Sequence, residues 1–377
     1  MENRIKEIPS GFSPRCPILS TLLLCRNYKL NLVESSFFQH FIRLKVLDLS
    51  DTDIEKLPAS ICHLTTLTVL LLGWCAKLSY VPSLAELTAL KKLDLSYTGL
   101  ENLPEGMERL KDLRYLNLDG SEVRDLQPGI LPKLSKLQFL KLHQKFGVFL
   151  PVEGHEVLRL QRLETLECNF RDLENFKIFN SRVLIPLIAC KVTVGRPSFS
   201  LLEDLNYTKS KSDLVTEAWF YDLMIDDASF LSQISFAKVV IVNCQNMRIL
   251  CPLDGYGTPK ILHLDSLMIL ETLFEAPSDR MKVLLPPWLL SSLQLEVIVV
   301  EDCHNMGVII EEDRIYQLTR IPLTIPHTLK KIQVDPESLR NSIEWAIISE
   351  EPVSNPQEDA AQLEAELAGE DPESFFF

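Results

Sequence analysis

The residues of this chain that could carry chemistry do not form a catalytic pattern. Cys303 and His304 are adjacent, and a thiol beside an imidazole can act as a nucleophile pair or as two metal ligands. Neighbouring residues of a strand or turn point in different directions, however, and no third ligand or orienting acid follows at a suitable spacing. We therefore expect neither a metal site nor a nucleophile at this pair.

Two groups of acidic residues have simple structural interpretations. Asp51 and Asp53 flank Thr52, and their side chains suit a tight turn. The run Glu311-Glu312-Asp313 could bind a cation or a basic partner, but we favour a solvated loop. The sequence contains no HExxH, GxSxG or Gly-rich phosphate loop. We expect a protein that is not an enzyme and that binds no metal or cofactor.

The nine cysteines are scattered along the chain, and no two of them form a CxxC pair. This spacing fits neither a zinc ribbon nor a thioredoxin-like motif. Buried thiols of a protein in a reducing compartment are the interpretation we favour.

The charge of the chain is acidic and unevenly distributed. The net charge is −14, and residues 350–377 carry nine acids and no Lys or Arg, so residues 1–349 carry only −5. Nucleic-acid binding needs clustered basic residues, so we expect no nucleic-acid partner. No secretory leader and no apolar run of membrane-spanning length is present. We expect a cytoplasmic protein without a membrane span.

A repeated pattern of leucines organises the first half of the chain. Four segments of the form L-x-x-L-x-L begin at Leu44, Leu67, Leu90 and Leu113, 23 residues apart, and Leu137 follows after 24. Such a period is typical of leucine-rich repeats, which stack into a solenoid. The sequence therefore predicts an α/β repeat fold, a curved horseshoe with a parallel sheet on the concave face and an irregular or helical convex side.

Each repeated position has a physical role. Two leucines that are two residues apart point to the same side of a short strand, toward the core. Thr52, Cys75, Thr98 and Ser121 occupy the slot where a small polar side chain can bond backbone groups left free by the turn. Leu-Pro and Val-Pro pairs such as Leu57-Pro58 suit the strand-free convex side.

The pattern divides the chain into five predicted regions. We expect a lead-in over residues 1–17, regular repeats over 18–174, and irregular or degenerate repeats over 175–235. A second, Cys-marked block with a terminal cap covers 236–348, and 349–377 is an acidic, disordered tail. Strands are predicted at Ile188–Val194 and around Ile241, Leu264, Val300 and Val334. Because terminal repeats need a cap, Ile18–Leu24 would be an apolar end unless residues 1–17 cover it.

Several stretches resemble the repeat region of plant intracellular immune receptors, the nucleotide-binding leucine-rich-repeat disease-resistance proteins of the coiled-coil subclass. The stretches are PRCPILSTLLLCRNYKL, the following SFFQHFIRLKVLDLSDTDIEKLPASICHLTTLTVLLLGWCAKLSYVPSL, VEDCHNMGVIIEE and the closing LKKIQVDPESLRNSIEW. Together they cover most of residues 5–348. The resemblance implies a protein that senses a pathogen effector or a guarded host protein and restrains a nucleotide-binding module.

The chain departs from that family where the repeats begin. Family members carry a coiled coil and a nucleotide-binding module before the repeats, whereas the first repeat here follows Met1 closely and no GxxxxGK[ST] occurs. An ADP or ATP site would belong to the absent module. We expect a truncated member, a fragmentary gene model or an isolated repeat domain. Two alternatives stay open, namely a stand-alone scaffold or adaptor and an enzyme within 175–235. Cell-surface receptor repeats are disfavoured.

The concave face is the predicted protein-binding surface, because strand residues between the leucines face solvent and exposed aromatic side chains mixed with charges suit interfaces. Some of these aromatics could instead pack on their neighbours and shield strand edges. The predicted partners are an effector, a guarded host protein or the nucleotide-binding module. The predicted residues are Arg26, Val46, Asp48, Ser50, Val69, Leu71, Trp74, Lys92, Asp94, Tyr97, Tyr115, Asn117, Phe139, Lys141, Thr165, Glu167 and Phe170.

Overall fold

The computed structural model describes residues 5–8, 11–12, 14–142, 150–181, 187–195, 216–225 and 236–245, together with the strands that follow up to Val334. The predicted terminal cap helix and acidic tail, Cys303, His304 and the run at 311–313 lie outside the described residues.

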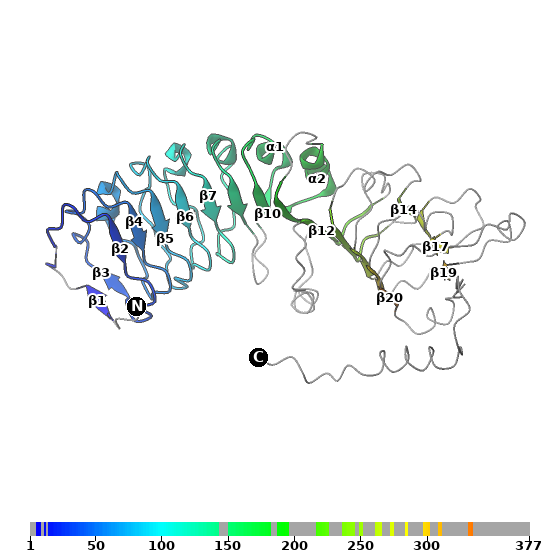
Figure 1. Ribbon diagram of the computed structural model, residues 1–377, viewed down its shortest axis with the longest axis horizontal. Helices are drawn as coiled ribbons and strands as arrows, with labels where there is room; N and C mark the ends of the chain where they lie inside the picture. The colour runs from blue at the N-terminus through cyan, green and yellow to red at the C-terminus, as the bar shows by residue number, and fades with distance from the viewer. Residues whose placement is uncertain are drawn as a thin grey trace, which may run out of the picture.

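One long parallel sheet runs through the described part of the chain (Figure 1). Its strands pair in chain order, so each turn of the solenoid, here called a coil, adds one strand. The strands are β2 (Thr21–Leu23), β4 (Val46–Asp48), β5 (Val69–Leu71), β6 (Lys92–Asp94), β7 (Tyr115–Asn117), β8 (Phe139–Lys141), β10 (Thr165–Phe170), β11 (Ala189–Val194), β12 (Thr216–Tyr221), β13 (Lys238–Val242), β15 (Ile261–Asp265), β18 (Val297–Glu301) and β20 (Lys331–Val334). β9 (Pro151–Val152) pairs beside β10.

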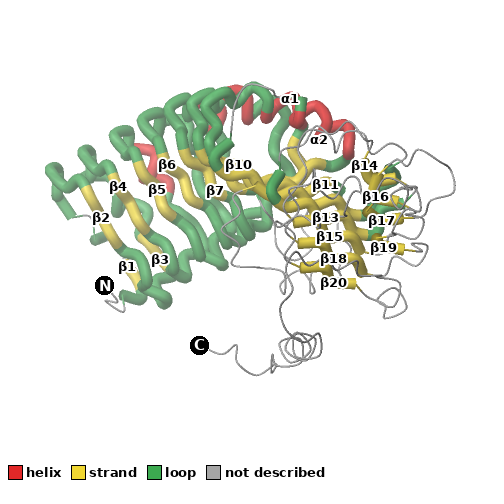
Figure 2. Tube along the Cα trace, turned by 45° about the vertical axis from the view of Figure 1, so that its right-hand side comes forward, coloured by secondary structure: helices red, strands yellow, loops and turns green. Residues whose placement is uncertain are grey.

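Short helices lie on the side opposite this sheet, as Figure 2 shows for the red segments. They are the 3-10 helices η1 (Ala59–His63), η2 (Met107–Arg109) and η3 (Leu131–Lys133) and the α-helices α1 (Gly154–Val157) and α2 (Leu173–Asn180). Smaller parallel pairs complete the described elements: β1 (Glu7–Ile8) with β3 (Leu32–Val33), β14 (Ile249–Cys251) with β16 (Thr272–Phe274), and β17 (Val283–Leu285) with β19 (Val308–Ile310). This is the predicted leucine-rich-repeat solenoid.

Ladders of leucine fill the space between the two sides. The parallel register stacks Leu47, Leu70 and Leu93 directly above one another, and all three are fully buried. Each coil leaves its apolar edge uncovered until the next coil stacks on it, so stability comes from contacts between neighbours. A buried leucine side chain contributes about 2 kcal/mol relative to an exposed one, and the repeated leucines therefore fix the stacking.

The polar slot of each coil behaves largely as the sequence predicts. Thr52 and Thr98 are buried, and each hydroxyl donates to a carbonyl three residues earlier at 2.8 Å. The Cys75 thiol donates to the Leu49 carbonyl at 3.2 Å. Asn27 fills the slot of an earlier coil, with its amide 2.7 Å from the Leu24 carbonyl. Ser121 is the exception, because its buried hydroxyl has no hydrogen-bond partner.

The sheet continues through the region predicted to be irregular. β11 falls on the predicted strand at Ile188–Val194. β12 lies where no repeat was expected, and it pairs with β11 on one side and β13 on the other. Its sequence, TEAWFY, lacks the leucine pattern because the side chains that point into the main core are those of Ala218 and Phe220. The irregularity of the sequence at β12 is therefore a change of core residues and not a break in the sheet.

Candidate protein-binding surface

Alternation along the strands creates the outer face of the sheet. Leu47 points into the core, whereas its neighbours Val46 and Asp48 are half-buried on the other side, and the same alternation recurs in β5 to β8. The register arranges these outer side chains in two rows across the sheet. One row holds Val46, Val69, Lys92, Tyr115, Phe139 and Thr165, and the other holds Asp48, Leu71, Asp94, Asn117, Lys141 and Glu167.

A third line of side chains follows the edge where the strands end. The backbone is left-handed at Arg26, Asp51, Trp74 and Tyr97, with φ of 60°, 58°, 64° and 54°. Each of these N–H groups donates to a carbonyl of the next coil, as that of Trp74 does to Ser96 at 2.8 Å. The equivalent hydrogen bonds place the four residues at matching positions of successive coils. We call this line the turn column.

Ser50 lies between the two-row surface and the turn column. It is half-buried, and its N–H donates to Oδ1 of Asp48 at 3.0 Å. Ser96 makes the same bond to Asp94 at 3.0 Å. These bonds fix the exit of the chain from the strand.

The predicted position of Phe170 on this face is wrong. Phe170 is fully buried, and its ring lies 5.1 Å from that of Phe179 in α2. At Trp74, four residues after the core residue Leu70, the backbone is left-handed and directs the side chain outward. β10 instead stays extended to residue 170, so strict alternation sends Phe170 inward with Leu166 and Cys168. Asn169 occupies the outer position that was assigned to Phe170.

The aromatic side chains of the face pack in pairs. Trp74 stacks on Tyr97 with ring centroids 3.9 Å apart and planes inclined by 11°. Tyr115 stacks on Phe139 at 4.2 Å and 9°, and the Lys92 ammonium lies 4.3 Å from the centre of the Tyr115 ring. The shielding interpretation therefore describes Tyr115, whose ring is covered by both Phe139 and Lys92. The partner-binding interpretation still applies to Trp74, which remains 57% exposed.

Lys141 is the centre of an ionic network on this face. Its ammonium lies 2.9 Å from Glu167 and 3.4 Å from Asp119, and the Tyr97 hydroxyl donates to Asp119 at 3.2 Å. Burial alone would lower the pKa of Lys141, but the hydrogen bond and charge of Glu167, together with Asp119, raise it. Sequence reasoning missed Asp119, although its place two residues after β7 could have indicated a face position.

The concave face changes character at β12 and β13. Trp219, Tyr221, Val240 and Val242 form an apolar cluster separate from the main core, and all four are buried. Their neighbours along the strands point into the main core, so these strands are apolar on both faces, as parallel strands buried on two sides are. The half-buried surface that carries charged side chains is thus the sector from β4 to β10.

Sequence reasoning also missed the charged row that leads to this cluster. The register continues the row of Lys141 and Glu167 through Lys191, Glu217 and Lys238. Lys238 is buried with its ammonium 4.6 Å from the centre of the Trp219 ring. Burial lowers its pKa in spite of the nearby charge of Glu217. A regular exchange of Lys and Glu at one strand position could have indicated these residues.

The cysteine thiols of the described residues are free, and most of them are buried. Burial raises the pKa of Cys75, and it raises that of Cys244 to about 12. A thiol that stays protonated is a poor nucleophile and metal ligand. Within the described ranges no group of three or more His, Cys, Asp or Glu side chains could hold a metal ion.

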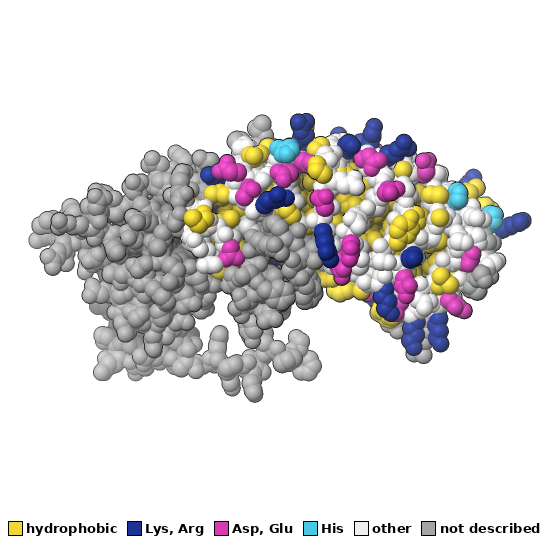
Figure 3. Space-filling view, turned by 180° about the vertical axis from the view of Figure 1, so that it is seen from behind, with side chains coloured by type: hydrophobic (Ala, Val, Ile, Leu, Met, Phe, Trp, Pro, Cys, Tyr) yellow, Lys and Arg dark blue, Asp and Glu magenta, His cyan; other side chains and the backbone are white. Residues whose placement is uncertain are grey.

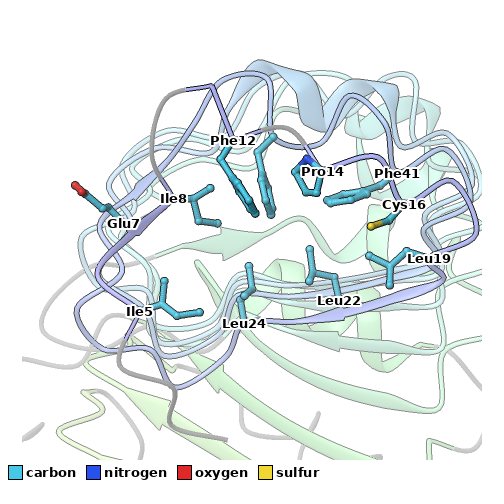
Figure 4. A pocket seen from close by; sticks show the side chains of 11 residues that line it. Ile5, Glu7, Ile8, Phe12, Pro14, Cys16, Leu19, Leu22, Leu24 and Phe41 are labelled. Carbon is cyan, nitrogen blue, oxygen red and sulfur yellow. The ribbon is translucent and has the colours of Figure 1, made fainter.

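An apolar cavity of about 480 Å³ lies inside the first coil (Figure 4). Leu19, Leu22 and Leu24 form its floor along β2, Phe12 lies across from them, and Cys16 lies at the end near Leu19. Residues ahead of Ile18 therefore contribute to covering the end of the solenoid, as the sequence suggested, but they leave it partly hollow.

The outer surface carries charges of both signs. On the side shown in Figure 3, acidic and basic side chains are interspersed over the coloured part, and neither sign forms a continuous field. The helices in the described portion of the chain include none that is long and apolar enough to cross a membrane.

The sheet, the leucine ladders and the repeated polar slot define a leucine-rich-repeat fold. The family model described as leucine rich repeat matches residues 17–76. Among solved structures the chain is similar to the Leptospira interrogans LRR protein LIC12759, with a TM-score of 0.41, 17% identity and coverage of 84% of this chain and 81% of that one.

The repeats of this chain resemble those of plant disease resistance proteins. Disease resistance protein At4g27190 of Arabidopsis thaliana is 33% identical over 176 residues, which are 44% of this chain and 18% of that protein. Probable disease resistance protein At1g12290 of the same plant is 35% identical over 184 residues, 45% and 18% of the two chains. The chain thus spans less than a fifth of the length of either relative.

Proposed function

We propose that this chain is the protein-binding repeat region of a plant intracellular immune receptor. Its partners would be a pathogen effector or a guarded host protein, and it would regulate defence signalling in the cytoplasm. The half-exposed face from β4 to β10, with stacked aromatics and charges, is the observation that carries the proposal. Resemblance to disease resistance proteins supports the biological setting.

The proposed mechanism is competition for one curved surface. A contact with the nucleotide-binding module would hold the receptor inactive, and a contact with the effector or guarded protein would replace it. A ligand shifts such an equilibrium only by its different affinity for the two states. The proposal assigns binding to this chain and no catalytic step.

Charge reversal on the concave face tests the proposal. We expect Lys92→Glu or Asp94→Lys to weaken co-purification with the co-expressed nucleotide-binding half of a related receptor by about tenfold. Each substitution would place a charge opposite a partner group of the same sign. Both variants should still unfold in one cooperative transition, followed by circular dichroism, and Asp94→Lys should be slightly less stable because it loses the bonds from Ser96.

Lys111→Glu is the matched control, since this exposed lysine lies in the turn before β7 and outside the rows of the face. Retained association of both face variants, or loss of their fold, would contradict the assignment of the surface.

The second candidate is a stand-alone leucine-rich-repeat scaffold or adaptor. It would use the same face, and absence of any stable complex with a nucleotide-binding half would favour it. Mapping the 5′ end of the native transcript separates the two directly, because an in-frame nucleotide-binding module upstream would identify the chain as part of a receptor.

A further inference from the structure

Trp74 presents a fixed aromatic platform with one free face. Its ring stacks on Tyr97 at 3.9 Å, and 57% of the residue remains exposed. Tyr97 comes from the following coil, so the uncovered face of Trp74 looks toward the preceding coil. An exposed tryptophan usually has several side-chain orientations, but stacking restricts this one before any partner arrives.

The structure beneath Trp74 holds the platform in place. The Tyr97 hydroxyl is bonded to Asp119 at 3.2 Å. The same ring lies over Gly120, where an added Cβ would come within 2.7 Å of it. Glycine at this position therefore leaves room for the Tyr97 ring, and the stack is supported from two sides.

Two aspartates, one from the coil before Trp74 and one from the coil after it, have no cationic partner among the described residues. Asp51 is the residue of the turn column in the coil before Trp74, and none of the described bases pairs with its side chain. Oδ1 of Asp94 accepts from the Ser96 N–H and hydroxyl at 3.0 and 2.6 Å, and Oδ2 can still accept a hydrogen bond from a ligand. Asp94 lies beside Gly73, where an added Cβ would come within 3.3 Å of Oδ1, so glycine leaves room for this carboxylate next to the residue before Trp74.

The charge balance of this sector is acidic. Residues 46–53, 69–76 and 92–99 contain four aspartates and one lysine, Lys92. That lysine lies over the Tyr115 ring, on the side away from Asp51. A flat aromatic face beside unpaired carboxylates matches a guanidinium group, which stacks on tryptophan and offers five N–H donors in one plane.

We propose that Trp74, Asp51 and Asp94 bind an arginine side chain of the partner protein. The guanidinium stacks on the free face of Trp74 and donates to Asp51 in the preceding coil, and the charge of Asp94 in the following coil adds to the attraction. This inference rests on the proposed function, because it names the chemistry of the partner at the same surface. Lysine would gain the charge attraction but not the planar stacking and paired donors.

Fluorine NMR of the full chain labelled with 5-fluorotryptophan tests this proposal. The chain has four tryptophans, and Trp74→Phe identifies the resonance of Trp74. The probe is Nα-acetyl-arginine amide, compared at constant ionic strength with the citrulline analogue, which has the same shape and no charge. We expect a saturable shift of the Trp74 resonance alone, with arginine binding about tenfold tighter than citrulline.

Substitution of the carboxylates gives the matched controls. Asp51→Asn and Asp94→Asn should each reduce the preference for arginine by several-fold. Asp53→Asn makes the same charge change two residues away, but Asp53 already pairs with Lys77 at 2.8 Å, so the preference should remain. The resonance of Trp219, which lies in the buried cluster on β12 and β13, reports whether each variant keeps its fold.

Equal binding of arginine and citrulline would overturn the inference, as would an equal loss in Asp53→Asn and Asp51→Asn. The proposed function fails separately, when Lys92→Glu and Asp94→Lys leave the association with the nucleotide-binding half intact. A chain that loses this association on charge reversal but does not distinguish arginine from citrulline keeps its function and lacks this site.

Discussion

Single polar side chains inside the coils decide whether a turn is satisfied. Thr52 and Thr98 return a hydrogen bond to their own coil, while Ser121, at the equivalent place, is buried without a partner. A buried unsatisfied hydroxyl costs about 1 to 3 kcal/mol, and a satisfied one contributes about 1 kcal/mol. The hydroxyl at this position of the repeat therefore stabilises the fold in Thr52 and Thr98 and destabilises it in Ser121.

Substitution at these two positions should have opposite effects. Ser121→Ala should raise the free energy of unfolding by about 1 kcal/mol, because it removes an unpaired hydroxyl. Thr98→Val keeps the shape and loses the bond to the Leu95 carbonyl, so it should lower that free energy by about 1 kcal/mol. Urea unfolding measures both. A loss of stability in Ser121→Ala would mean that the hydroxyl has a partner in solution.

At the scale of elements, the two α-helices replace the 3-10 helices on the convex side where the strands lengthen. α2 begins at Leu173, and the side chain of Asp172 before it accepts from the Asn175 N–H at 2.9 Å and so caps the helix. α1 packs against α2 through Gly154, whose N–H donates to Oδ1 of Asn175 at 2.9 Å. A Cβ on Gly154 would overlap the Asn175 carbonyl oxygen.

Gly154→Ala should therefore lower the free energy of unfolding by about 2 kcal/mol, since the helices must separate to admit a methyl group. Gly129→Ala is the comparison, because Gly129 has open space around it and only a left-handed backbone, φ 81°. That strain costs about 1 kcal/mol. Equal losses in the two variants, measured by urea unfolding, would show that the helices adjust without cost.

At the scale of the whole molecule, a solenoid buries apolar surface at every junction between coils and leaves it open at an end. β2 pairs with β4 on one side, and the coil that contains it encloses the cavity of Figure 4. Terminal coils without a polar cap limit solubility. The end that was expected to be apolar at Ile18–Leu24 is therefore covered in part, because residues before Ile18 line the cavity together with Leu19 and Leu24.

Filling that hollow should change the surface chemistry of the end. A polarity-sensitive apolar dye should fluoresce with the native chain, and Cys16→Phe should reduce the signal at least by about half, because Cys16 lines the cavity. His63→Phe adds the same side chain at an exposed position of η1 and should not reduce it. An unchanged signal in Cys16→Phe would place the dye elsewhere.

The sequence alone determined the solenoid, because leucine spacing sets which side chains point inward, and stacking is the only way to bury them. It also determined most of the outer face, because residues such as Val46, Asp94 and Tyr115 alternate with those leucines in short strands. Alternation could not show where each strand ends and its turn begins. That boundary, which depends on packing against α2, sends Phe170 inward while Trp74 turns outward.

The tertiary structure alone decided which outer side chains are free to act. From the sequence, both Lys141 and Lys92 could be expected to be free. In the structure Lys141 lies between the carboxylates of Asp119 and Glu167, and Lys92 lies over the Tyr115 ring. Asp51 appeared only as a turn residue until the stacking of coils placed it in the same column as Trp74. Pairing across coils joins residues about 23 positions apart, and no local pattern reports whether such a pair forms.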